Sequence, residues 1–153
     1  IEALLDGDPE GLAHAVRRSC EIKAEVVAED EREAGRRAIL NFGHTFGHAI
    51  EHCQGYGEWL HGEAVAAGMV MAAELSNIDA EDKRRISRLI ERAGLPVKVP
   101  AIGAARMRAA MGMDKKVLGK QLRFVLLDRL GHAITTSSYD EERLAKVLEA
   151  SNG

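Results

Sequence analysis

Apolar residues recur at helical spacing along most of this chain. After a short helical stretch at residues 1–6, they repeat every three or four positions to about Glu29, which predicts one long amphipathic helix. Asp8 is suited to be the N-cap of this helix, and Pro9 to occupy its first turn. The same criterion predicts further helices at residues 42–53, 63–75, 79–93, 104–113 and 140–150.

Two segments near the C-terminus have a different pattern. Residues 121–127 and 132–138 read as strands, and residues 128–131 between them carry a hairpin signal. No internal repeats or low-complexity linkers occur. The sequence therefore predicts a mainly α fold, a helical bundle with one small β-hairpin.

Composition narrows the class of protein. A chain of 153 residues suits one domain, and we expect residues 1–153 to form a single helical domain. The net charge of -3 argues against a nonspecific nucleic-acid binder, which would be strongly basic. The two cysteines form no Cys-x-x-Cys pair, and no run of about 18 apolar residues occurs. We therefore expect a cytoplasmic protein with neither a membrane nor a nucleic acid as partner.

Histidines are concentrated in residues 41–63, which hold four of the six. If residues 42–53 are helical, His44, His48 and His52 fall at positions i, i+4 and i+8 and project from one stripe. Imidazoles on one helix face are suited to binding a metal or to moving protons near neutral pH. This stretch is therefore the leading candidate for a functional site.

Spacing alone favours His44 and His48 as a metal-binding pair with a further ligand from elsewhere. The Gly-rich loop at residues 54–57 allows the chain to turn back, so that His61 could reach the same pocket. A simpler interpretation also stays open at this stage, in which one histidine functions and the others are surface or core residues.

Basic residues upstream of the histidines are weaker candidates. Arg37 and Asn41 lie one helical turn apart, and on a continuous helix they would share a stripe with His44 and His48. Lys23 is flanked by acidic residues, for which an ion pair on the helix surface is the simpler explanation.

Several motifs together resemble the C-terminal domain of 3-dehydroquinate synthase. The resemblance rests on residues 40–51 and 55–69, and extends to residues 19–27, 93–96 and 114–116 in the same order. It implies an NAD- and metal-dependent carbon-oxygen lyase that eliminates phosphate. That enzyme converts 3-deoxy-D-arabino-heptulosonate 7-phosphate, a small phosphorylated sugar acid, into 3-dehydroquinate in the shikimate pathway of aromatic amino acid biosynthesis.

The resemblance also implies roles for individual residues. His44 and His61 match the two histidine ligands of a divalent metal, zinc or cobalt, whose third ligand is a glutamate upstream of this chain. His48 matches an acid-base and substrate-contacting group, and Glu33 an acidic catalytic residue near the same pocket. The remaining substrate contacts match Lys23, Arg37, Asn41 and the pair Lys115 and Lys116, of which either lysine could be the contact.

The nucleotide site is expected elsewhere. The chain has no G-x-G-x-x-G fingerprint, and it opens on Ile1 rather than Met. We therefore expect a fragment or separated domain that lacks an N-terminal NAD-binding domain, is inactive alone, and is a homodimer when full length.

Three alternatives remain at this stage. Another sugar phosphate cyclase, such as an inosose synthase, would share fold, metal and NAD but act on a different sugar phosphate. A metal-dependent alcohol or glycerol dehydrogenase domain would have no need of Arg37 and the lysine pair. A noncatalytic helical interaction domain would bind no metal through His44 and His61.

Overall fold

The structure is a computed structural model that describes residues 1–153 apart from 32–34, 56, 100, 117–121 and 151–153. The chain forms two compact units, residues 1–40 and residues 41–153. The single domain expected from the sequence therefore stays a prediction, and each unit is described by itself.

The first unit is helical. It contains α1 (Glu2–Leu5) and the long helix α2 (Pro9–Glu29). The carboxylate of Asp8 accepts a hydrogen bond from the backbone N–H of Gly11 at 2.6 Å, which satisfies one of the free donors at the start of α2. The long helix and its predicted cap are therefore confirmed.

A 3-10 helix, η1 (Arg36–Asn41), follows α2. Before it, the carboxylate of Asp30 accepts hydrogen bonds from the backbone N–H groups of Gly35 and Arg37 at 2.8 and 2.9 Å. These bonds satisfy backbone donors at the start of η1.

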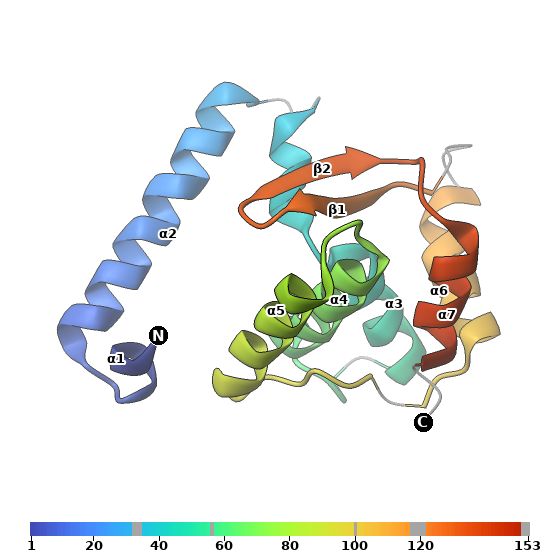
Figure 1. Ribbon diagram of the computed structural model, residues 1–153, viewed down its shortest axis with the longest axis horizontal. Coiled ribbons are helices and arrows are strands. Elements are labelled where there is room, and N and C mark those ends of the chain that lie inside the picture. The colour runs from blue at the N-terminus through green and yellow to red at the C-terminus, as the bar shows by residue number, and fades with distance from the viewer. Residues whose placement is uncertain (32–34, 56, 100, 117–121, 151–153) are drawn as a thin grey trace. The chain divides into compact units, whose positions relative to one another are not determined.

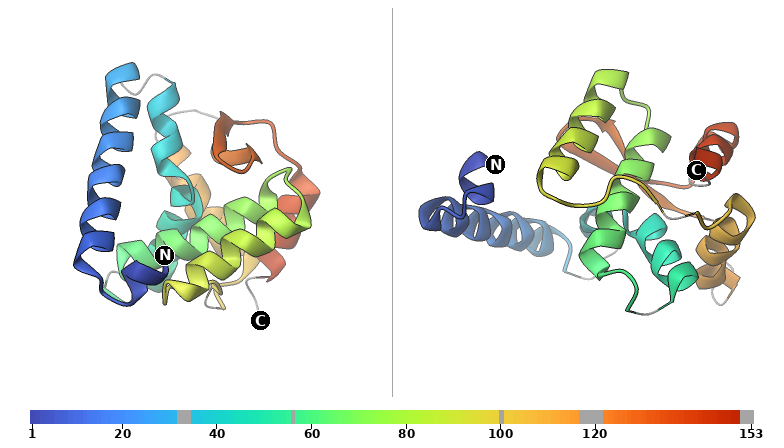
Figure 2. Two further views of the ribbon diagram at one scale, coloured as in Figure 1. Left: turned by 60° about the vertical axis from the view of Figure 1, so that its left-hand side comes forward. Right: turned by 90° about the horizontal axis from the view of Figure 1, so that it is seen from below.

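The second unit contains five α-helices and one hairpin among the residues described. They are α3 (His44–Gln54), α4 (His61–Leu75), α5 (Ala80–Arg92), α6 (Ala104–Lys116), β1 (Phe124–Arg129), β2 (His132–Thr136) and α7 (Glu141–Glu149). α4 is central, because α3, α5, β1 and α7 all contact it, while α6 lies against α3 and α7 (Figures 1 and 2). The mainly α fold with one hairpin is confirmed.

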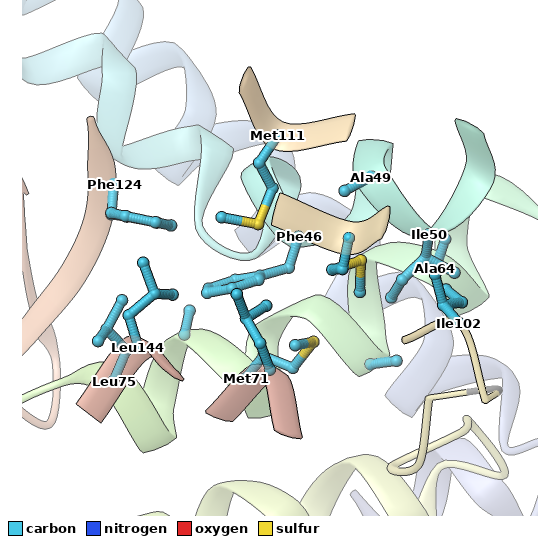
Figure 3. Packing of buried hydrophobic residues seen from close by; sticks show 14 of the residues in the cluster. Phe46, Ala49, Ile50, Ala64, Met71, Leu75, Ile102, Met111, Phe124 and Leu144 are labelled. Atoms are coloured by element: carbon cyan, nitrogen blue, oxygen red, sulfur yellow. The ribbon is translucent and has the colours of Figure 1, made fainter. Parts of the chain in front are cut away.

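The core of this unit lies between α3, α4, α6, α7 and β1 (Figure 3). The rings of Phe46 and Phe124 stack with centroids 5.2 Å apart, and Tyr139 meets Phe124 edge-on at 4.9 Å. Phe46 is fully buried, which contributes roughly 2 kcal/mol. Together with Ile50 and Cys53 it fixes which face of α3 points inward, and so which face is left for other contacts.

The hairpin differs in detail from the expected one. β1 continues through Arg129, with an irregularity in the register between Leu127 and Arg129. The turn is therefore shorter than the predicted residues 128–131, and Gly131 adopts a φ of 79° within it. Glycine is favoured at such a φ because it has no Cβ, so Gly131 suits this position in the turn.

Ser76 connects three elements at the end of α4. Its buried hydroxyl donates to Ala72 O at 2.7 Å and accepts from the backbone N–H of Leu127 in β1 at 2.9 Å. Its carbonyl oxygen accepts from Nη1 of Arg143 in α7 at 3.0 Å. This residue therefore satisfies polar groups that packing has removed from water.

We expect Ser76→Ala to lower the free energy of unfolding by about 2 kcal/mol, because the N–H of Leu127 loses its acceptor. Urea unfolding followed by circular dichroism measures the change. Ser138→Ala is the matched control: Ser138 is exposed and its bonds to Thr136 use main-chain atoms. Equal stability of the two variants would contradict the expectation.

Among the residues that the structure describes, no helix has both the length and the apolar character needed to cross a membrane.

Candidate metal and substrate site

Three histidine rings meet where α3 lies beside the start of α4. The ring centroids of His44 and His48 are 5.5 Å apart, those of His44 and His61 are 5.5 Å apart, and those of His48 and His61 are 5.9 Å apart. His44 and His48 come from α3, and His61 is the first residue of α4. The return of the chain after the Gly-rich loop thus brings His61 to the other two rings.

Glycines allow the close approach of α3 and α4 at this point. Gly43 has a φ of 82°, and a Cβ on it would lie 2.7 Å from the backbone nitrogen of Met69. A Cβ on Gly68 of α4 would overlap the carbonyl oxygen of Gly43 and lie 2.8 Å from the nitrogen of Gly47. Any larger residue would push the helices apart. The crossing of these two helices therefore depends on the absence of side chains.

Glu51 completes the cluster and was missed by the sequence reasoning. Both of its carboxylate oxygens lie 3.2 Å from Nδ1 of His61. At 3.6 residues per turn, position 51 is only about 20° around the helix from His44, whereas position 52 is about 80° away. His52 is accordingly exposed. The spacing i, i+4, i+7 of His44, His48 and Glu51 places the three on one helix face and could have predicted the role of Glu51.

Partial burial lowers the pKa of the His44 ring below the ordinary 6.5, because burial withdraws water from the charged form. The hydrogen bond with the carbonyl of Phe42 acts in the opposite direction, and His48 and His61 lower the pKa further. His44 is therefore neutral near pH 7 and has a nitrogen lone pair available.

The donor set fits a divalent metal such as zinc or cobalt, for which neutral imidazole nitrogens are suitable ligands. Nδ1 of His44 lies 3.4 Å from Phe42 O and Nδ1 of His61 contacts Glu51, so Nε2 of each ring is left to bind a metal. A second set, His48 with Glu51 and His61, has ligand atoms that all lie within 4.8 Å of one another. The two sets share His61, and the assignment of His44 as the other ligand stays a prediction.

Glu63, which the sequence placed at a helix start, has a structural role. Its carboxylate accepts a hydrogen bond from the backbone N–H of Leu60 at 2.9 Å, in the first turn of α4. This bond satisfies one of the free donors at the helix N-terminus and keeps the segment that carries His61 in place.

The continuous helix on which Arg37 and Asn41 would share a stripe with His44 does not form. Residues Arg36–Asn41 form a 3-10 helix, and Gly43 adopts a left-handed conformation directly before α3 begins at His44. Glycine suits this position twice over, because a positive φ disfavours a side chain and a Cβ would lie 2.7 Å from the backbone nitrogen of Met69 in α4. Asn41 is exposed and does not continue the α-helical stripe of His44.

The predicted cationic contacts lie in separate parts of the chain. Lys23 is exposed on α2, and Arg37 lies in η1, both within residues 1–40. Lys115 and Lys116 end α6, and their side chains lie outside the described part of the structure, as does the whole of Glu33. Their roles in binding substrate stay predictions.

Two solved structures share this fold. One is 2-epi-5-epi-valiolone synthase from Streptomyces hygroscopicus subsp. jinggangensis 5008 with NAD+ and Zn2+ bound, at a TM-score of 0.80 and 23% identity over 94% of this chain. The other is 2-deoxy-scyllo-inosose synthase complexed with carbaglucose-6-phosphate, NAD+ and Co2+, at a TM-score of 0.68 and 25% identity over 82% of this chain. This chain spans 41% and 38% of their respective lengths.

The fold is thus that of a helical domain found in sugar phosphate cyclases. Residues 1–117 match the family model described as 3-dehydroquinate synthase C-terminal. The chain therefore belongs to the family of 3-dehydroquinate synthase C-terminal domains.

Proposed function

We propose that this chain is the metal- and substrate-binding part of a 3-dehydroquinate synthase. The reaction would convert 3-deoxy-D-arabino-heptulosonate 7-phosphate into 3-dehydroquinate and phosphate, as a carbon-oxygen lyase of the shikimate pathway. The observation that carries this proposal is the meeting of the His44, His48 and His61 rings within 5.9 Å, in a chain that matches the family over residues 1–117.

The proposed cofactors are NAD and a divalent metal, zinc or cobalt. The two related structures are described with NAD+ together with Zn2+ or Co2+. Because this sequence has no G-x-G-x-x-G fingerprint and spans about two fifths of those proteins, we assign NAD binding mainly to a separate nucleotide-binding domain. The proposed assembly is a homodimer in the cytoplasm.

The side chains of the cluster have distinct proposed tasks. Nε2 of His44 and Nε2 of His61 would hold the metal. A bound divalent metal supplies Lewis acidity toward a hydroxyl or carbonyl oxygen of the substrate. An imidazole nitrogen of His48, one turn from His44, would contact substrate and move a proton near neutral pH.

Cationic and polar side chains would bind and orient the sugar acid. Lys23, Arg37 and one of the lysines at 115 and 116 are suited to its carboxylate and phosphate, since charged donors bind such anions strongly. Asn41 would donate to a substrate oxygen, and Glu33 would act near the same pocket. Holding the substrate in one orientation is the main contribution expected of these residues.

The test is a phosphate-release assay with NAD and Zn2+. We expect no release of phosphate from 3-deoxy-D-arabino-heptulosonate 7-phosphate by this chain alone. A protein that joins it to its nucleotide-binding domain should release phosphate and form 3-dehydroquinate. Turnover by the isolated chain would contradict the assignment of NAD binding to a separate domain. No turnover by the joined protein would overturn the proposed function.

A second candidate is a cyclase for another sugar phosphate, because both related structures are cyclases with other products. The same assay with glucose 6-phosphate, whose carba analogue is bound in one of them, distinguishes the two. Phosphate release from that sugar phosphate alone would favour the second candidate.

A further inference from the structure

Both carboxylate oxygens of Glu51 face the same imidazole nitrogen. Oε1 and Oε2 both lie 3.2 Å from Nδ1 of His61, in a contact that joins α3 to the first residue of α4. An ionised carboxylate can only accept hydrogen bonds, so this contact is a hydrogen bond in the form of His61 that carries its proton on Nδ1. The carboxylate of Glu51 therefore favours that form of the ring.

The position of this proton decides what the other nitrogen can do. A neutral imidazole has one N–H, so a proton on Nδ1 leaves the lone pair on Nε2. Metal-binding histidines in proteins commonly have this arrangement, in which a carboxylate or carbonyl holds the second nitrogen and fixes the ring. His44 has a carbonyl in the same place, with Phe42 O 3.4 Å from its Nδ1.

We propose that Glu51 is a positioning residue for His61. Its carboxylate accepts the Nδ1–H, fixes the ring orientation and keeps Nε2 free as a metal donor. The proposal rests on the proposed function in one respect, namely that His61 is a metal ligand.

Direct ligation by Glu51 is the competing interpretation, since Glu51 belongs to the compact set with His48 and His61. Two observations favour positioning. Both carboxylate oxygens face the same nitrogen, as expected of an acceptor that holds a ring. In addition, the Glu51 side chain is 21% exposed and that of His61 is 57% exposed, so the carboxylate is the more sheltered partner. A hydrogen bond to an ionised carboxylate is stronger than one between neutral groups.

The first test needs no metal. Nitrogen NMR of the imidazoles at a pH of about 8, where an ordinary histidine is neutral, reports which nitrogen is protonated. We expect the Nδ1–H form for His61 in the native chain and a shift to the Nε2–H form in Glu51→Ala. Glu51→Gln, whose amide oxygen still accepts, should retain much of the native form. Glu58→Ala, which removes an exposed carboxylate outside the cluster, should change nothing.

The second test measures metal binding by competition with a zinc indicator. Glu51→Ala should weaken Zn2+ binding by about 10- to 100-fold, and Glu51→Gln should weaken it less. With Co2+ in place of Zn2+, the visible absorption spectrum reports the coordination number of the bound metal. We expect the same coordination number in the native chain and in both variants.

Three results separate the possibilities. A native His61 in the Nε2–H form would overturn the proposal. Equal loss of Zn2+ binding in Glu51→Ala and Glu51→Gln, with a changed Co2+ coordination number, would also overturn it, because Glu51 would then be a ligand. If neither this chain nor the protein joined to its nucleotide-binding domain bound Zn2+ but His61 kept the Nδ1–H form, the metal assignment of the proposed function would fail and the positioning of His61 by Glu51 would stand.

Discussion

Gly68→Ala is expected to lower the free energy of unfolding of this chain by about 3 kcal/mol. The added Cβ would overlap the carbonyl oxygen of Gly43 and lie 2.8 Å from the nitrogen of Gly47. Both are backbone atoms, which cannot move aside as a flexible side chain can. Relief of the overlap would therefore require α3 and α4 to separate.

Urea unfolding followed by circular dichroism measures this effect, and Gly62→Ala is the matched control. Gly62 lies in the same helix, and a Cβ there would meet nothing within 4 Å. Because alanine favours helix over glycine, Gly62→Ala should be as stable as the native chain or more stable, by up to about 0.5 kcal/mol. Equal stability of the two variants would mean that the helices do not approach this closely.

The same substitution tests whether helix packing positions the site. If Gly68→Ala remains folded at low temperature, separation of α3 from α4 should move His61 away from His44 and weaken Zn2+ binding. Gly62→Ala should bind Zn2+ as the native chain does. Full binding by a destabilised Gly68→Ala would show that the distance between these rings is set by other contacts.

His61→Ala is expected to weaken Zn2+ binding by at least about 100-fold. His61 belongs to both possible ligand sets, and loss of a ligand should exceed the 10- to 100-fold effect typical of an outer-shell partner. Competition with a zinc indicator measures the change. His52→Ala is the control, because His52 is exposed on the same helix, about 80° around it from His44.

His44→Ala and His48→Ala then distinguish the two ligand sets. We expect His44→Ala to weaken binding about as much as His61→Ala, and His48→Ala to retain most of the affinity. The reverse order would mean that His48 and Glu51 hold the metal with His61, and the role of His48 in proton transfer would be wrong.

Much of the secondary structure could be predicted from the sequence. The long helix α2 and its Asp8 cap follow from local chemistry, since a side-chain acceptor beside free backbone donors needs no distant partner. α4 carries no charged residue between Glu63 and Glu74, and most of its residues are buried, as a central helix requires. The break between η1 and α3 was not predicted, because the positive φ of Gly43 and its close approach to the backbone of α4 are seen only in the tertiary structure.

The sequence by itself determined the helical class, the family resemblance and the importance of the histidine segment, because spacing along one helix follows from its fixed number of residues per turn. Only the tertiary structure decided that His61 meets His44 and His48, and that Glu51 rather than His52 belongs to the cluster. These contacts depend on how closely two helices can approach. That distance is set by Gly43, Gly47 and Gly68, whose effect appears only when the two backbones are brought together.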